Sequence, residues 1–373
     1  MTKANGSLKI AMVGSRGMAV PYSGVETSVT ELSQRLAVRG HEVHVFTRRR
    51  YRHDIEPIHR GVHVRFKRSI NTKHLDTITH LLTSVPATLF ENFDIVHFHA
   101  LGPSLFSPLP RIFGKKTVAT VQGLDWQRKK WNGFAKGVLQ LGEWTSAKGP
   151  NATTVVSHVL ERIYESRYGA HARYIPNGVN HAEPVPPDNI KRWGLEKDGY
   201  VLFLARLSQE KNPHLLLEAW DRVKSDKPLV IAGDNPYAPE YVDSLHRQAR
   251  GKNVIFTGFQ TGATWQELFS NAYLYVLCSD IEGQPISLLE AMSYGCCPLV
   301  SDIPENAEVV EGGRGFTFRT GDVGDLAATI QRLLEDPTSV RAAAATARAH
   351  VRAEHDWERI TDDTLAVYRS VLG

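Results

Sequence analysis

Two glutamates, Glu282 and Glu290, stand eight residues apart in the segment SDIEGQPISLLEAMSYG. Glu282 follows a predicted strand, and Pro285 favours a helix that begins nearby, because proline is tolerated in a first helical turn. Backbone N–H groups from Gln284 to Ser287 would then face outward and could bind an anion. From this segment alone a second interpretation is equally good: Ser287 and Glu290 fit a capping box, which would make Glu290 structural.

Two cations follow another predicted strand. In ARLSQEKN, Arg206 and Lys211 lie where the chain leaves the strand at 200–205. A guanidinium fork and a compact ammonium together suit a diphosphate. A solvated polar loop is the alternative, since arginine and lysine are common in loops. Both this loop and Glu282 follow strands of a predicted parallel sheet, so we expect them at the edge where such sheets bind ligands.

Three further features lie in the first half of the chain. The glycines of GSRGMAVPYSGVET, among them Gly24, permit close approach to a ligand, although a flexible loop is the alternative. In TVQGLDWQRKKW, Gln122 and Asp125 stand among aromatic and basic residues that suit a sugar or an anionic acceptor; the alternative is the start of an amphipathic surface helix. His97 and His99 end a strand and share one face, which is either a ligand cleft or the core.

Several kinds of site are missing from the sequence. It has no P-loop, no G-x-S-x-G, no H-E-x-x-H and no loop with Asp-x-Asp. The cysteines Cys278, Cys296 and Cys297 lie in hydrophobic segments without a metal-binding spacing, and the adjacent pair is poorly placed for a disulfide. We therefore expect no metal ion and no cofactor, with protein cations neutralising any bound phosphate.

The 373 residues alternate β-branched runs with helical periods, which predicts an α/β chain of two doubly wound parallel-sheet domains in tandem. No apolar run has the length of a membrane span, and the first residues lead directly into a strand, so a cytoplasmic protein is expected. Residues 1–180 carry 13 more basic than acidic side chains, and residues 181–373 carry 9 more acidic than basic ones. The basic half suits a lipid phosphate, an anionic membrane or nucleic acid, or it is simply a solvated surface.

Taken together, these motifs resemble the retaining glycosyltransferases of family four, which have the GT-B fold. ARLSQEKN matches the Arg-x-x-x-x-Lys loop of that family, and EGQPISLLE matches its pair of glutamates separated by seven residues. IPNGV resembles its interdomain segment, and DWERITDDTLAVY resembles its C-terminal helix. RGMAVPYSGVET and GLDWQRKKW resemble a rhamnosyltransferase-like bacterial subgroup of cell-surface polysaccharide synthesis.

The resemblance implies two Rossmann-like domains that face each other across a cleft. Residues 1–180 would bind the acceptor, residues 181–354 would bind the nucleotide sugar, and the helix at 355–373 would cross back to the first domain. Arg206 and Lys211 would hold the donor diphosphate, Glu282 the transferred sugar and Glu290 the ribose. The other implied donor contacts are Gln284, Pro285, Ile286, Ser287, Phe259 beside the nucleobase and Gly24 from the first domain; weaker acceptor or sugar contacts are Gln122, Asp125 and His99.

The expected activity is a metal-independent transfer from a nucleotide-diphosphate sugar to a glycan or lipid-linked acceptor, with retention. Peripheral contact with the inner face of an anionic membrane is compatible with it, and no nucleic-acid partner is expected. Two departures from the family pattern are Gln122, where many members carry histidine, and Ser23-Gly24 in place of two glycines. Glutamine cannot carry a proton, which favours proton transfer to the donor phosphate itself. A nucleotide-sugar epimerase and a non-enzymatic sugar-binding protein are the alternatives.

Overall fold

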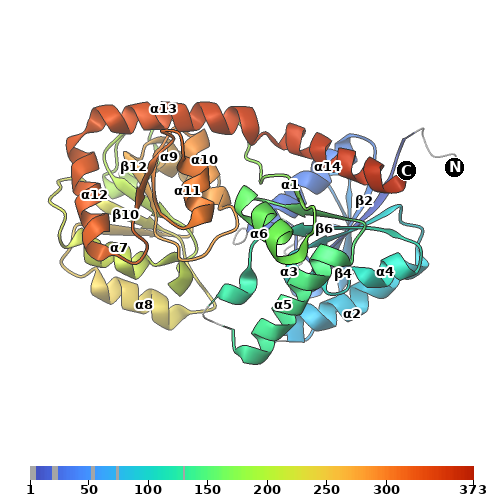
Figure 1. Ribbon diagram of the computed structural model, residues 1–373. Coiled ribbons are helices and arrows are strands. Elements are labelled where there is room, and N and C mark those ends of the chain that lie inside the picture. The colour runs from blue at the N-terminus through green and yellow to red at the C-terminus, as the bar shows by residue number, and fades with distance from the viewer. Residues whose placement is uncertain (1–5, 19–23, 52–54, 73–74, 129–130) are drawn as a thin grey trace. The chain divides into compact units, whose positions relative to one another are not determined.

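The chain forms two compact units, shown in Figure 1. The computed structural model describes residues 6–18, 24–51, 55–72, 75–128 and 131–373. The first unit comprises Met1–Asn177 and Trp357–Gly373, and the second comprises Gly178–Asp356. Each unit is an α/β layered structure with its own core.

The first unit is built on an eight-stranded sheet in the order β3-β4-β2-β1-β5-β6-β7-β8. All neighbouring strands are parallel except β3, a two-residue strand antiparallel to β4 at one edge. The sequence predicted the parallel strands but not this edge hairpin. The strands are β1 (Lys9–Val13), β2 (Glu42–Arg48), β3 (Ile58–His59), β4 (Val62–Lys67), β5 (Ile95–His99), β6 (Lys116–Val121), β7 (Ala152–Val155) and β8 (Arg173–Tyr174).

Alternate residues of β1 face opposite layers of helices, as the pleat of a strand requires. Ile10 and Met12 pack in a core with the first and last helices, whereas Ala11 and Val13 pack in a core with the second helix. The helices of this unit are α1 (Gly24–Val38), α2 (Leu75–Phe90), α3 (Leu101–Ser104), α4 (Pro108–Ile112), α5 (Gly133–Lys148), α6 (His158–Tyr168) and α14 (Trp357–Leu372), with 3-10 helices at Arg49–Tyr51 and Asp125–Gln127.

The last helix, α14, completes the core of the first unit although it follows the whole second unit in sequence. Trp357, Ile360, Leu365 and Tyr368 are buried in the core that contains β1, β2 and α1. The hydroxyl of Tyr368 lies 2.7 Å from Nδ1 of His97. At its start, Glu358 accepts from Arg39 at 2.7 Å. The apolar helical period at this end of the sequence therefore has its partner surface in the first unit.

The second unit has a fully parallel six-stranded sheet in the order β11-β10-β9-β12-β13-β14. Its strands are β9 (Val201–Leu204), β10 (Leu229–Ala232), β11 (Val254–Gly258), β12 (Leu274–Leu277), β13 (Cys297–Ser301) and β14 (Phe316–Phe318). Its helices are α7 (Pro213–Trp220), α8 (Pro239–Gln248), α9 (Gly262–Ser270), α10 (Ile286–Ser293), α11 (Pro304–Val310), α12 (Val323–Glu335) and α13 (Pro337–Glu354), with 3-10 helices at Asn189–Trp193 and Gln209–Lys211.

The helices of the second unit divide between the two faces of the sheet. Helices α9, α10 and α11 contribute to one core, and α7, α8 and α12 contribute to the other. Cys278, Cys296 and Cys297 are buried free thiols in these cores, and burial raises the pKa of each of them. Among the described residues, no helix combines the length and apolar character needed to cross a bilayer.

Replacing Tyr368 with alanine should loosen α14 from the first unit. The side chain is fully buried, and deletion of a buried aromatic ring costs about 3–5 kcal/mol of stability. Urea unfolding should shift to lower concentration, and hydrogen exchange should accelerate along α14. Ser370→Ala, an exposed change two residues further along the same helix, is the matched control and should leave both unchanged. Equal behaviour of the two variants would contradict the docking role of Tyr368.

Candidate functional site

The strand order of the second unit places a switch point between β9 and β12. The chain continues from β9 toward β10 on one side, and β12 leads to β13 on the other. The loops after these two neighbouring strands therefore diverge, and ligands of open α/β sheets bind at the carboxyl edge beside such a switch point. Arg206 follows β9, and Glu282 follows β12. The candidate site is thus built by two loops that sequence reasoning had placed at one edge.

Lys211 and Glu282 form an ion pair across this switch point. Lys211 ends the 3-10 helix after β9, and Glu282 lies in the loop before α10. The Lys211 side chain is 17% exposed and the Glu282 side chain 10% exposed, so the pair is largely shielded from solvent. Arg206, also mostly buried, donates to Glu210 at 3.2 Å on the same loop. One predicted cation and one predicted carboxylate are therefore in direct contact.

Asn212 ties the two loops together, and sequence reasoning missed it. Its side-chain amide donates to the carbonyl of Cys278 at 3.0 Å and to Asp280 at 2.5 Å. The backbone N–H of Asp280 donates to the carbonyl of Glu210 at 3.0 Å. Asn212 has φ of 50°, a left-handed conformation that asparagine tolerates better than most residues. These bonds hold Lys211 opposite Glu282.

Gly233, after β10, lets a third loop approach the same edge. Its φ is 144°, and a Cβ atom there would lie 2.0 Å from the carbonyl oxygen of Ala205, which precedes Arg206. Any side chain would therefore push the loop after β9 away. The glycine is needed for backbone packing in the site's wall.

The start of α10 corrects the capping-box interpretation. The helix begins at Ile286 with Pro285 as the N-cap residue, which offers no side-chain cap. Ser287 lies inside the first turn, and its hydroxyl accepts from the hydroxyl of Tyr275 at 2.9 Å. Ser287 therefore does not cap the helix, and the box with Glu290 does not form. First-turn amides of a helix lack intrahelical acceptors, so those of Ile286 and Ser287 remain suited to an anion.

Glu290 lies one turn further along α10 and is partly exposed, whereas Gln284 is almost fully buried before the helix. Tyr275, whose hydroxyl fixes Ser287, is completely buried on β12, and burial raises its pKa. Phe259 is partly exposed immediately after β11, at the same edge but two strands away from β9.

A third carboxylate, Glu305, lies near Glu282 and was not predicted. It stands in the first turn of α11, which follows β13, the next strand in the sheet. Burial raises the pKa of Glu305, and the negative charge of Glu282 raises it further. The sequence signal was present, since Pro304 and Glu305 also follow a strand and begin a helix.

In the first unit, the structure gives the predicted residues different environments. Gly24 is exposed at the start of α1, and its neighbour Ser23 lies outside the described residues. Gly14, another glycine of the segment GSRGMAVPYSGVET, serves internal packing: a Cβ atom there would lie 2.5 Å from the carbonyl oxygen of His99.

Gln122 and Asp125 follow β6 and are partly exposed. Asp125 pairs with Arg128 at 3.0 Å. The indole N–H of Trp126 donates to the fully buried Glu143 at 2.6 Å. Residues Asp125–Gln127 form a 3-10 helix, and the bond from Trp126 to Glu143 anchors it to α5.

His97 and His99 both lie in the core. His97 bonds to Tyr368 at 2.7 Å and to Thr120 at 2.6 Å. His99 is 2% exposed, with Nε2 3.4 Å from the sulfur of Met12. Burial lowers the pKa of His99 to about 3 and that of His97 well below its usual value. Both imidazoles are therefore neutral at physiological pH, and the core interpretation describes them.

Two family models match the chain in succession. Residues 22–183 match the model described as Glycosyltransferase Family 4, and residues 187–350 match Glycosyl transferases group 1. The chain is 26% identical to O-antigen chain mannosyltransferase B of Escherichia coli over 63% of its own length and 61% of that protein. It is 27% identical to alpha-maltose-1-phosphate synthase of Mycolicibacterium smegmatis over 74% of its own length and 79% of that protein.

Solved structures share the fold at lower identity. Sucrose-phosphate synthase of Thermosynechococcus elongatus superposes with a TM-score of 0.85 at 21% identity, covering 98% of this chain and 99% of that one. HepE of Anabaena, in complex with UDP and glucose, superposes with a TM-score of 0.81 at 18% identity, covering 97% of this chain and 100% of that one. Both confirm the predicted two-domain fold.

The raised pKa of Glu305 predicts a pH-dependent stability difference. Stability from such a group is complete below the unfolded pKa, about 4.3, and is lost as pH rises through the folded value. Glu305→Gln should therefore gain stability relative to the unaltered protein between pH 4 and pH 7, measured by thermal unfolding. Glu311→Gln, an exposed change at the end of α11, should show no such trend. A constant difference across this pH range would contradict the assignment.

Proposed function

The chain belongs to the glycosyltransferases whose family 4 and group 1 domains it carries in succession, and from this premise we propose its reaction. It transfers a sugar from a nucleotide-diphosphate donor to an acceptor hydroxyl, with retention of the anomeric configuration and without a metal ion. The observation that supports this most is the placement of Arg206 and Lys211 with Glu282 at the switch point of the second sheet.

The donor diphosphate is proposed to bind between Arg206 and Lys211. As the bond between the sugar and the phosphate breaks, negative charge grows on the leaving diphosphate, and fixed cations stabilise it. Amides at the start of α10 add further donors without a metal. A nucleoside diphosphate is the ligand of HepE, which has the same fold. This proposal gives phosphate neutralisation to the protein alone.

In the proposed complex, Lys211 contacts the leaving diphosphate directly and the transferred sugar through Glu282. Its ammonium has three donors, so it can keep Glu282 as partner while a phosphate oxygen takes another donor. Glu282 has two oxygens and can accept from sugar hydroxyls with the one that Lys211 leaves available. Glu290, one turn further along α10, is proposed to accept from the ribose.

The acceptor proton is proposed to leave with the diphosphate. Gln122 carries no titratable group. His99 is buried in the core with its pKa lowered to about 3, so neither side chain is suited to act as a base. In the proposed step the acceptor oxygen attacks the sugar carbon on the side that the phosphate leaves, and a phosphate oxygen takes the hydroxyl proton. The new bond therefore keeps the original configuration.

The acceptor is proposed to be a glycan or lipid-linked saccharide of a bacterial surface, as suggested by the likeness to an O-antigen mannosyltransferase. Apolar side chains on the first unit support membrane contact. We call the exposed residues Ile112, Phe113, Phe134, Leu141 and Trp144 the α4–α5 patch. Ile112 is 79% and Phe134 82% exposed, which is unusual for such side chains in water.

Geometry and charge of the α4–α5 patch suit an anionic membrane. Phe134 and Leu141 stand seven residues apart and therefore share one face of α5, which is drawn in green in Figure 1. Ile112 and Trp144 line a shallow hollow between α4 and α5 together with Arg111 and Lys148. Apolar side chains beside cations bind the interface of an anionic bilayer.

Sugar transfer should depend on the Lys211–Glu282 pair. Incubation with a panel of UDP-, dTDP- and GDP-sugars should reveal one donor that raises the melting temperature. At a hundredfold excess over Kd, binding of that donor should add about 2.7 kcal/mol to the free energy of unfolding. Lys211→Met and Glu282→Gln should each lower transfer about 100-fold or more, because each removes charge from the reacting centre. Product formation from the selected donor is the measurement.

Lys252→Met is the matched control for these variants. Lys252 pairs with Asp221 at 2.8 Å and is equally shielded, at 17% exposed, but it precedes β11 at the opposite edge of the sheet. It should keep nearly full activity. The proposal fails if no donor binds, if Lys211→Met transfers normally, or if EDTA abolishes transfer at a temperature where the protein stays folded. Conversion of the donor sugar without an acceptor would point to the epimerase instead.

Vesicle binding should depend on the α4–α5 patch. The affinity for phosphatidylglycerol vesicles, measured by sedimentation, should fall about 100-fold or more when Ile112 and Phe134 are both changed to serine, since burial of each such side chain is worth about 1.5–3 kcal/mol. Val38→Ser removes an equally exposed apolar residue from the end of α1 and should bind normally. Equal binding by all variants would contradict the proposal. So would concentration-dependent dimerisation that the double change abolishes, because the patch would then serve a second copy.

A further inference from the structure

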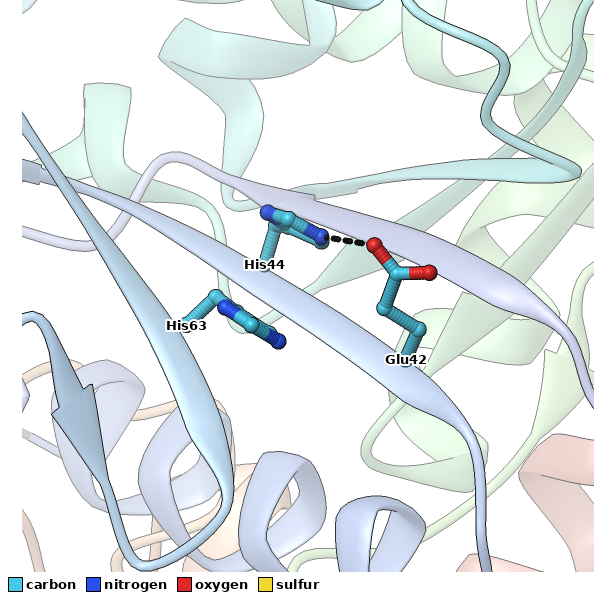
Figure 2. Close-up of side chains that lie close together, drawn as sticks. All are labelled: Glu42, His44 and His63. Atoms are coloured by element: carbon cyan, nitrogen blue, oxygen red, sulfur yellow. Dashed lines mark hydrogen bonds and ion pairs between the residues drawn. The ribbon is translucent and has the colours of Figure 1, made fainter. Parts of the chain in front are cut away.

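Glu42, His44 and His63 lie together on the first unit, and none of them was singled out in the sequence. Glu42 and His44 are two residues apart on β2, so both side chains point to one face of the sheet. His63, on β4, is the register partner of His44 in the parallel β2–β4 pair. Figure 2 shows the two imidazole rings one above the other, with the Glu42 carboxylate beside His44.

The ligating atoms of these three residues lie within 4.8 Å of one another. Nε2 of His44 is 2.7 Å from Oε1 of Glu42, and the two rings stack at 4.6 Å with an angle of 11°. Zinc binds imidazole nitrogen and carboxylate oxygen at about 2.0–2.2 Å in a tetrahedron, which places ligand atoms about 3.3 Å apart. Side-chain rotation is therefore enough to converge the three ligands, because the backbone register already aligns them.

The environment leaves room for an ion to enter. His44 is 4% exposed, whereas the Glu42 side chain is 45% exposed at the start of β2. A carboxylate open to solvent beside a buried imidazole gives an entry path and a position for a water ligand.

Lys9 is the competitor for this position. Its ammonium lies 2.8 Å from the same Oε1 of Glu42, and it also lies over the ring of Phe93 at 5.4 Å. An entering divalent ion would replace Lys9 as the partner of Glu42. The long lysine stem can stay against Phe93 while its charged end turns to water. Lys9 therefore weakens metal binding without preventing it.

We propose that Glu42, His44 and His63 bind one divalent transition-metal ion of the zinc class, which joins β2 to β4. Two imidazoles and one carboxylate favour zinc, nickel or cobalt over magnesium or calcium, which prefer oxygen ligands alone. Glu42 begins β2, so the site lies toward the amino ends of the strands, whereas ligands of such sheets bind at the carboxyl ends. The ion would be structural, and the inference does not rest on the proposed transfer reaction.

The test uses the full chain without a histidine tag, treated with EDTA and then desalted. Addition of zinc chloride should leave one zinc per chain after gel filtration and raise the melting temperature by about 5 °C or more at saturating metal. Glu42→Gln and His63→Gln should each lose the bound zinc and the shift. His171→Gln, which removes an exposed histidine of the same unit, should keep both. Cobalt in place of zinc should give visible absorption only where the three ligands are intact.

Lys9→Met separates a metal site from a simple ion-pair cluster. If the three residues bind zinc, removal of the competing ammonium should tighten zinc binding about fivefold. If the cluster is only an ion-pair network, Lys9→Met lowers the melting temperature and zinc remains unbound, which overturns the proposal. Zinc retained by both Glu42→Gln and His63→Gln, with cobalt absorption unchanged, overturns it as well. Transfer activity is a separate readout, since zinc-free protein should remain active at low temperature.

Discussion

The ion pair between Lys211 and Glu282 is the interaction on which the candidate site depends. Both side chains are largely shielded, so each charge has lost much of its hydration, and the pair recovers this only through its own attraction. Removal of one partner from such a pair costs about 3–5 kcal/mol, whereas the intact pair adds little net stability. The pair is therefore poor as a source of stability and well suited to fixing two loops relative to each other. Asn212 does the same through hydrogen bonds from its uncharged amide, which do not depend on the position of the Lys211 side chain.

The charges around this pair bear on the proposal that the site binds a diphosphate. Without a ligand, Lys211 is balanced by Glu282, and Arg206 is near Glu210. In the proposed function, an incoming diphosphate would compete with these carboxylates for the two cations. Glu305 adds a second acidic group near Glu282, and its raised pKa shows that its charged form is disfavoured there. In the proposed function, a diphosphate would enter a site whose two cations are already held in place by Glu210 and Glu282.

The sequence alone could place the residues of the candidate site together, because the loops after parallel strands lie at one edge of a sheet by necessity. Arg206, Lys211 and Glu282 could be assigned to that edge from strand ends alone. Their contact needed more, since only the strand order makes β9 and β12 neighbours. Asn212 and Gly233 were missed for the same reason. Asn212 bonds to a neighbouring loop, and Gly233 lets a neighbouring loop approach, and neither loop is near in sequence.

The capping box shows why a local motif can mislead. Ser287 and Glu290 have the correct spacing, yet α10 begins one residue earlier, and the buried hydroxyl of Tyr275 takes Ser287 as its acceptor. A partner twelve residues upstream, brought close by the strand, outcompetes the local pattern. His99 is the converse case. Its position at a strand end suggested a ligand contact, but the face it shares with His97 is covered by α14, which lies at the far end of the sequence.

The register of β2 and β4 extends this argument to the first unit. His44 and His63 are nineteen positions apart in sequence, and only their pairing in the ladder makes them neighbours. β4 is held on one side by β2 and on the other only by the two-residue β3, so it lies close to a sheet edge, where strands separate most easily. A metal ion bound by residues of both β2 and β4 would resist this separation. The same link in the middle of the sheet would add less, because each strand there is already paired on both sides. The two proposed sites thus differ in their physical requirement. A metal ion between β2 and β4 would hold strands together, whereas Arg206 and Lys211 would have to bind a ligand and release it.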